Sequence, residues 1–325
     1  MTAPARELAG AGAGPATLDV ALDAGTVRVH LAAIADGADG DTVRARLEVD
    51  PDAPPGWLQG LHGLAGLAGL SGLLGLLGGG REGGGAPATP EERAAQAVAA
   101  TTLDWDADAR RLTVRGPRDL GLRGVPLALT VRAPAGTDVQ LRAGAARVVV
   151  EGPAGEVAVR GTGAVTLDEV TGRADLRCGA GEVRIGRLRG PLELRGGAGG
   201  VRIDRVLAPA EITTGAGRIR LGEVHADVAV RAAAGDVEVA DAVAGDLEIG
   251  TGVGTLWVGV HPGVDARVEL RAAAGRVHSE LPVQRERPGP AGGAGADARP
   301  LHVRARTGAG DVTVAPARPR PALTA

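Results

Sequence analysis

The sequence predicts an all-β protein built as a parallel β-solenoid, with about 18 residues and two short strands in each coil. Two observations lead to this prediction: glycine recurs at a fixed spacing over the second half of the chain, and apolar residues alternate with polar ones between the glycines. A third observation concerns the core. The 325-residue chain contains no Phe or Tyr and only three Trp, so Val, Leu, Ile and Ala must fill the interior. These small aliphatic side chains suit a narrow solenoid.

The repeat is marked by the second glycine of segments such as GAGEVRI, GAGGVRI and GAGRIRL. From Gly163 to Gly275 its members lie 18, 18, 18, 18, 19 and 21 residues apart, and GAGDVTV adds one more after an insertion. A half-repeat of nine residues places Gly172 and Gly190 midway between members. A constant period is typical of repeats that bury an apolar face against their neighbours. The predicted structural repeat glycines are Gly163, Gly181, Gly199, Gly217, Gly235, Gly254, Gly275 and Gly310.

Each half-repeat carries apolar residues at alternate positions, as Val183 and Ile185 show, while Glu182 and Arg184 fill the outward positions. Alternation with period two indicates short strands with one buried face. Glycine at the corners permits a positive φ and a tight turn. An antiparallel sandwich of short strands is the alternative, but it would not keep the same position apolar every 18 residues.

Three alternating segments near the N-terminus, 17–22, 26–31 and 43–49, predict strands that cap one end of the solenoid and cover its strand edge. Residues 58–78 then repeat Leu-x-Gly seven times without a charge. That run is long enough to cross a membrane, but its glycines disfavour a helix, and the elements before and after it fit one domain. We therefore expect a low-complexity insertion in a loop. Membrane contact through residues 57–80, as a surface hairpin or a span, is the alternative that the sequence favours less.

A short helix is predicted over TPEERAAQAVAAT, because Thr89 suits the N-cap, Pro90 the first helical position, and Glu92 completes a capping box. A hairpin follows, near 101–106 and 111–115. The predicted organisation is a disordered N-terminus at 1–16, cap strands at 17–56, the Leu/Gly-rich insertion at 57–88, the helix and hairpin at 89–124, solenoid repeats at 125–315 with a loop insertion at 283–300, and a disordered tail at 316–325.

The stretch from about 125 to 315 resembles the DUF4097 family of bacterial β-strand repeat proteins, which carry a provisional adhesin label. The segments that carry this resemblance are VPLALTVRAPAGTDVQLRAG, the GAGEVRIGRLRG-type units, AAGRVHSELP and VRARTGAGDVTV. The segments ATLDVALDAGTVRVHLA and LDWDADARRLTVRGP are similar to the lead-in strands of the family. The resemblance implies a β-solenoid-like fold and an adhesin-like role. It supplies no catalytic residue.

Composition and charge argue against several classes of function. The 36 basic residues, all Arg, are interspersed with 39 acidic ones to give a net charge of −3, so the basic patch of a nucleic-acid binder is missing. A single cysteine, Cys178, cannot form an internal disulfide or a Cys-based zinc site. The first residues lack the charged start and apolar run of a secretory signal, so we expect a cytoplasmic protein.

Calcium binding is not expected, although some nine-residue glycine repeats bind that ion. A calcium ladder needs Asp at one position of successive turns, and here the position after the repeat glycine is variable and holds Arg twice. The residues at that position are Ala164, Glu182, Gly200, Arg218, Asp236, Thr255 and Arg276. The six histidines also lack metal-ligand spacing, so no metal and no cofactor is expected.

An enzyme acting on polysaccharides is the main rival class, because parallel β-helices also carry such activity. It would need clustered carboxylates. The acidic candidates in the repeats occupy different positions: Asp204, Glu223, Asp241 and Asp246. Trp257 lies at an outward position between Leu256 and Val258 and is predicted to be an exposed contact point.

We therefore expect a non-catalytic scaffold, an adhesin-like interaction module that binds a protein or surface partner of unknown identity. One alternative is a self-assembling scaffold in which solenoid ends stack on each other. A second is a polysaccharide-active β-helix enzyme.

Overall fold

A computed structural model of the chain describes residues 5–12, 14–32, 42–51, 89–281 and 300–317. The predicted insertion at 57–88, residues 283–299 of the loop predicted at 283–300, and residues 318–325 of the tail predicted at 316–325 lie outside the described residues. The chain divides into two compact units, the N-terminal unit Met1–Val149 and the C-terminal unit Val150–Ala325. Strand β9 (Arg147–Ala154) spans the division.

Strands form in the N-terminal unit where alternation predicted them. They are β2 (Thr17–Leu22), β3 (Gly25–Ala32) and β4 (Thr42–Val49). Two further strands, β7 (Leu127–Pro134) and β8 (Asp138–Ala143), pair in parallel with β3 and β2 respectively. The sequence predicted that the solenoid repeats begin at residue 125, which would include β7 and β8. The structure places both strands in the N-terminal unit.

The prediction of disorder over residues 1–16 was wrong for the segment that forms β1 (Ala5–Ala11), which pairs antiparallel with β4. The sequence ARELAGA shows no strict alternation and so gives no signal for a strand. Contacts with distant residues hold this strand in place. The Arg6 guanidinium donates a hydrogen bond to the carbonyl oxygen of Thr101. Gly10 leaves room for the Trp105 indole, whose Cδ2 lies 2.4 Å from the place that a Cβ would take.

The predicted helix is confirmed as α3 (Pro90–Ala100). The hydroxyl of Thr89 accepts a hydrogen bond from the Glu92 amide at 3.2 Å, and the Glu92 carboxylate accepts one from the Thr89 amide at 2.8 Å. The predicted hairpin is also confirmed, as the antiparallel pair β5 (Thr102–Asp106) and β6 (Arg111–Arg115).

A one-turn helix, α4 (Leu120–Arg123), was not predicted. Its four residues are too few to show a helical period, and Asp119 caps it by accepting the Gly121 amide at 2.7 Å.

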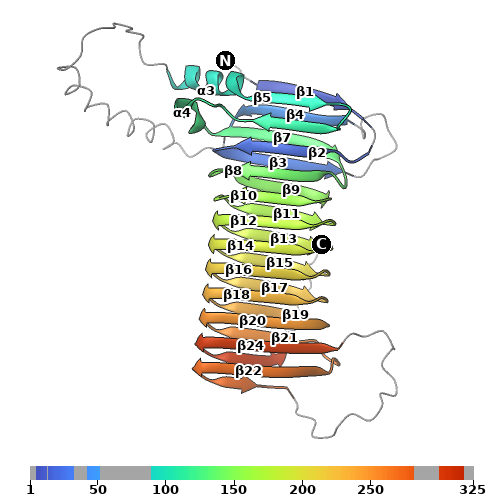
Figure 1. Cartoon of the computed structure of the whole chain (residues 1–325), viewed down its shortest axis with the longest axis vertical. Coiled ribbons are helices and arrows are strands. Elements are labelled where there is room, and N and C mark those ends of the chain that lie inside the picture. The colour runs from blue at the N-terminus through green and yellow to red at the C-terminus, as the bar shows by residue number, and fades with distance from the viewer. Residues whose placement is uncertain (1–4, 13, 33–41, 52–88, 282–299, 318–325) are drawn as a thin grey trace, which may run out of the picture. The chain divides into compact units, whose positions relative to one another are not determined.

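The C-terminal unit is a stack of two-stranded coils, drawn from green to red in Figure 1. The first strands of the coils form the even sheet: β10 (Val157–Gly161), β12 (Ala174–Ala180), β14 (Leu192–Ala198), β16 (Ala210–Ala216), β18 (Val228–Ala234), β20 (Gly245–Val253), β22 (Ala266–Ala274) and β24 (Leu301–Ala309). The second strands form the odd sheet: β11 (Val165–Val170), β13 (Val183–Leu188), β15 (Val201–Val206), β17 (Ile219–Val224), β19 (Val237–Ala242), β21 (Leu256–Val260), β23 (Val277–Ser279) and β25 (Val312–Pro316).

Neighbouring coils pair in parallel with the register that the period of 18 requires, as when Val183 faces Val201 and Ile185 faces Ile203. These side chains point between the two sheets and are at most 4% exposed. Burial of one such aliphatic side chain stabilises the fold by roughly 1.5–3 kcal/mol. The predicted parallel β-solenoid with two strands per coil is confirmed.

The repeat glycines form a column at one corner of the coils. All but Gly163 have φ between +105° and +150°, a conformation that only glycine adopts readily. They are also packed against the coil before: a Cβ on Gly217 would lie 2.0 Å from the carbonyl oxygen of Gly199. Both the backbone conformation and the close approach therefore require glycine here.

The last coils do not stack in the order of the sequence. The coil formed by β24 and β25 lies between the coil of β20 and β21 and the coil of β22 and β23, as Figure 1 shows. The glycine column agrees, because Gly310 packs against Gly254 and Gly275 packs against Gly310. The sequence predicted a loop between the last two coils and did not address the order in which the coils stack. It could not show the exchange, since every coil carries the same apolar pattern and fits either place.

Candidate interaction face

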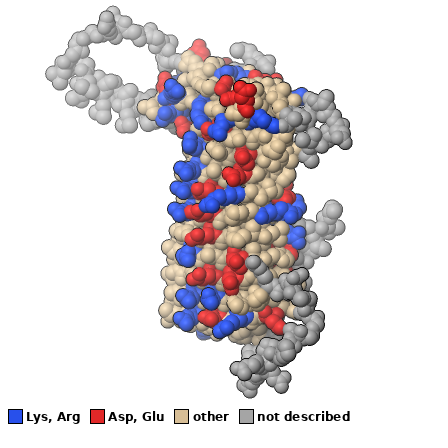
Figure 2. All heavy atoms as spheres, turned by 45° about the vertical axis from the view of Figure 1, so that its right-hand side comes forward, with Lys and Arg blue, Asp and Glu red and all other residues tan. Residues whose placement is uncertain are grey.

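The outer face of the even sheet carries two rows of charged side chains, because the constant register keeps outward positions of successive strands side by side. The first, which we call the acidic row, runs Asp175, Glu193, Glu211, Ala229, Glu248, Arg304, Glu269. The second, the arginine row, runs Arg177, Arg195, Thr213, Arg231, Gly250, Arg306, Arg271. Figure 2 shows acidic and basic side chains gathered in such rows across the strands of this unit.

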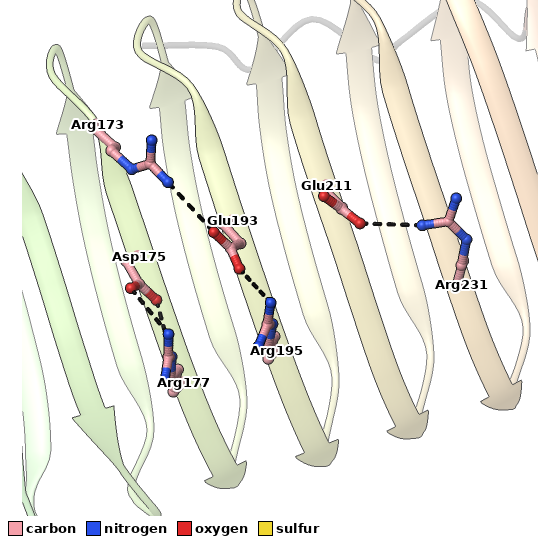
Figure 3. Close-up of polar contacts among 7 residues, drawn as sticks. All are labelled: Arg173, Asp175, Arg177, Glu193, Arg195, Glu211 and Arg231. Carbon is pink, nitrogen blue, oxygen red and sulfur yellow. Dashed lines mark hydrogen bonds and ion pairs between the residues drawn. The ribbon is translucent and has the colours of Figure 1, made fainter.

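Ion pairs join the two rows within a coil. The Arg177 Nε lies 3.3 Å from the Asp175 Oδ1, and the Arg195 Nη2 lies 2.7 Å from the Glu193 Oε1. Both pairs are two residues apart on one strand, so the side chains lie on the same face (Figure 3). Exposed pairs of this kind contribute only about 0–1 kcal/mol to stability. The rows of charged side chains therefore contribute little to the stability of the sheet and mainly determine the charge of its outer surface.

Other ion pairs join neighbouring coils. The Arg173 Nη2 lies 3.4 Å from the Glu193 Oε2, and the Arg231 Nη1 lies 3.1 Å from the Glu211 Oε1 (Figure 3). Glu193 thus receives one guanidinium from its own strand and one from the coil before.

A shallow groove of about 420 Å³ lies along the acidic row. Its apolar lining includes Ala229 and the two prolines that precede strands, Pro191 and Pro209, above buried core residues such as Leu192 and Val228. Five carboxylates face two guanidinium groups and one imidazole, so the groove is acidic at neutral pH. These ionisable residues are Glu193, Glu211, Asp227, Asp246, Glu248, Arg173, Arg304 and His302.

Contacts inside the groove fix part of this charge. The His302 Nδ1 lies 3.1 Å from the Asp246 Oδ1, and the Asp227 carboxylate accepts the Asp246 amide at 3.0 Å. Glu211 and Glu248 are exposed to solvent, which leaves both carboxylates accessible to a partner.

The outer face of the odd sheet holds a separate row that contains Arg184, Arg202, Arg220, Glu238 and Trp257. Its guanidinium groups are bound by local carboxylates; the pair between the Arg220 Nε and the Glu238 Oε2 measures 3.2 Å. Trp257, predicted as an exposed contact point, is half-buried. Its ring lies over Gly259, with Cη2 2.9 Å from the place that a Cβ would take.

Of the four acidic residues considered for catalysis, the structure brings two together and places the other two elsewhere. Glu223 and Asp241 face each other on adjacent strands of the odd sheet, Asp204 lies on β15, and Asp246 lies on the even sheet in the groove. His225 and Arg205 hydrogen-bond the Glu223 carboxylate, at 2.6 and 2.9 Å, and hold its pKa below the usual value, His225 having the larger effect. A glycosidase general acid needs the opposite shift.

Aspartates at the coil corners have a structural role that sequence reasoning missed. Asp236 accepts the backbone amide of Thr255 at 3.0 Å, which is the main reason that its pKa is lowered. Asp311 accepts the amide of Arg276 at 2.8 Å in the same way. Both follow a repeat glycine, at the position tested for calcium. The dipeptide Gly-Asp is the sequence signal for this role, because the carboxylate that follows a repeat glycine accepts a backbone hydrogen bond from the adjacent coil.

Three further observations concern features that often carry function. Among the described residues, no three His, Cys, Asp or Glu side chains are grouped so that they could hold a metal ion. Cys178 is buried in the core of the even sheet, and burial raises the pKa of its thiol to about 11. No helix within the described ranges has the length and apolar character needed to cross a membrane.

Comparisons with known proteins add little. No family model matches the chain, so the resemblance to the DUF4097 family rests on its sequence segments alone. No curated protein matches either. A crystal structure of a protein from Clostridium sporogenes, provisionally described as a cell adhesion protein, aligns with 96% of this chain and 99% of that chain. The identity is 10% and the TM-score is 0.20, so this likeness carries no argument about function.

Proposed function

We propose that this chain is a non-catalytic, adhesin-like interaction module and that its C-terminal unit presents the outer face of the even sheet to a protein partner. The observation that carries the proposal is the acidic groove, with its apolar lining and the exposed carboxylates of Glu211 and Glu248. A partner segment that fits this groove is extended and rich in Arg or Lys. Complementary charge of this kind raises association rates and selects partners.

The state of the carboxyl groups supports a binding role over a catalytic one. Where a carboxyl pKa departs clearly from its usual value, as in Asp19, Glu223 and Asp236, it is lowered by hydrogen bonds from Arg115, from His225 and from the Thr255 amide. These groups are ionised at neutral pH and serve as acceptors.

The regular spacing supports an extended partner. Strands of one sheet lie about 4.8 Å apart, so Asp175, Glu193 and Glu211 repeat a negative charge at that interval over three successive coils. The adhesin label of the DUF4097 family, which the sequence resembles, motivates an adhesive role for such a surface.

Fluorescein-labelled octa-arginine, an extended cationic probe, tests this proposal. Its binding to the full chain is measured by fluorescence anisotropy at low and at high salt. We expect the double variant Glu211→Gln/Glu248→Gln to bind the probe roughly 5–30 times more weakly, as the loss of two charge contacts implies.

The matched control is Glu182→Gln/Glu238→Gln, which changes the net charge by the same amount on the odd sheet. We expect its affinity for the probe to stay within about twofold of the unaltered chain. Equal losses in the two double variants would mean that net charge, not the groove, attracts the probe, and would overturn the proposal.

A further inference from the structure

The terminal coil of the C-terminal unit leaves part of its apolar interior uncovered. Strands β22 and β23 are the last in their sheets, with β24 and β25 on one side and no described strand on the other. Val277 is 48% exposed, whereas Val312 beside it on β25 is fully buried. Val268 and Leu270 are also partly exposed, although the residues paired with them on β24 are buried.

The same coil presents two unpaired strand edges. Each edge strand has backbone amide and carbonyl groups that point away from the stack, and such edges readily pair with another chain. Since both sheets end at the same coil, one partner surface could cover both edges and the apolar floor between them.

The charges on β22 make this edge complementary to itself. Outward positions of the strand alternate as Arg267, Glu269 and Arg271. When two copies of the strand pair antiparallel about Leu270, Glu269 lies opposite the partner's Arg271. When they pair about Val268, Glu269 lies opposite the partner's Arg267. In both registers the inward residues of one copy meet inward residues of the other.

A two-fold axis that passes through β22 along the sheet normal produces this arrangement. It reverses the strand direction and the stacking direction but leaves each sheet on its own side. The even sheet of one copy therefore continues through β22 into the even sheet of the other, and the odd sheets of the two copies lie on the same side of the interface. A single isologous interface of this kind closes a dimer.

We propose that the coil of β22 and β23 is a self-association edge, through which two copies of the chain join end to end by antiparallel strand pairing. No residue of β22 or β23 lines the acidic groove, although the Glu269 Oε2 lies 4.0 Å from the Nε of Arg304 in that groove. The inference does not depend on what the groove binds and therefore stands independently of the proposed function.

Charge-swapped variants of the full chain test the proposal by sedimentation velocity from about 1 to 100 μM, the range of transient interfaces. We expect the unaltered chain to shift from monomer to dimer over this range. Glu269→Arg places three arginines on each edge, and Arg267→Glu/Arg271→Glu places three glutamates there. Each variant alone should dimerise at least about 30 times more weakly, because like charges meet across the edge.

An equimolar mixture of the two variants should restore the dimer, because an edge of three arginines then faces an edge of three glutamates. This rescue excludes unfolding as the cause of the loss. The control Glu211→Gln/Glu248→Gln should dimerise like the unaltered chain.

An unaltered chain that stays monomeric at every concentration would overturn the proposal. Dimers that persist when each of the two charge-swapped variants is measured alone, or that fail to re-form in the mixture, would overturn it as well. Hydrogen exchange supplies a second measurement. Among the amides of Arg267 to Arg271, those that point away from β24 should gain protection only on dimerisation, whereas those that donate to β24 are protected in the monomer as well. Equal protection of the outward-pointing amides in the dilute monomer would show that another part of the chain covers the edge.

Discussion

Replacing one glycine of the corner column tests the physical account of the coil most directly. In Gly217→Ala the new side chain must adopt φ near +131° and place its Cβ 2.0 Å from the Gly199 carbonyl oxygen. A conformation that is rare for residues other than glycine costs about 1–3 kcal/mol. Moving two packed coils apart to relieve the overlap costs about 1–3 kcal/mol more. We therefore expect the free energy of unfolding to fall by about 2–6 kcal/mol.

The neighbouring column provides a matched control. A Cβ on Gly215 would lie 2.6 Å from the Gly197 carbonyl oxygen, but Gly215 does not have a positive φ. The next coil carries Ala233 at the equivalent position, which shows that a small shift accommodates a methyl group there. Gly215→Ala should therefore cost about 1 kcal/mol or less.

Urea unfolding followed by circular dichroism measures both variants, with the slope of the transition checked for each. The midpoint should fall clearly for Gly217→Ala and little for Gly215→Ala. If Gly217→Ala unfolds within about 1 kcal/mol of the unaltered chain, or if both variants lose the same amount, the column is not governed by backbone conformation and close approach.

Three further outcomes are expected. Glu223→Gln should destabilise the chain by about 1 kcal/mol at pH 7. Because the pKa of Glu223 in the folded chain lies below the usual 4.5, its stabilising contribution is complete above pH 4.5 and disappears as the pH falls through the folded pKa. A stability difference that stays constant down to about pH 2–3 would contradict this expectation. Cys178 should resist a thiol reagent at pH 8, where a pKa of about 11 leaves roughly one thiol in a thousand ionised, and should react at once in urea; rapid labelling of the folded chain would show that the thiol is accessible. Asp236→Ala should cost about 1–2 kcal/mol in urea unfolding by leaving the Thr255 amide without its acceptor, more than the control Glu238→Ala, whose partner is an exposed Arg.

Much of the C-terminal unit was predictable from local pattern. A period of 18 residues sets the register of Val183 on Val201, and alternation sets which side chains enter the core. The capping box at Thr89 was equally readable, because its contacts lie within four residues.

What escaped prediction depends on contacts between distant residues. Strand β1 has no strong pattern and is held by β4 and by Trp105. The acidic groove also escaped prediction, since its carboxylates come from different coils and meet only through the register. Trp257 was correctly placed at an outward position, but the space above Gly259 that half-buries its ring was not visible in the sequence.

The exchanged order of the last coils constrains how the chain folds during synthesis. Coils up to β21 are contiguous in sequence, so each can dock on its predecessor as it leaves the ribosome. The segment of β22 and β23 emerges next but does not pair with β20 and β21 in the native structure. Strands β24 and β25 lie between the two coils instead. Gly310 packs against Gly254, although the two residues lie 56 positions apart in the sequence. We therefore expect docking of the β22–β23 coil to wait until β24 and β25 have formed, and to be slow relative to the growth of the stack.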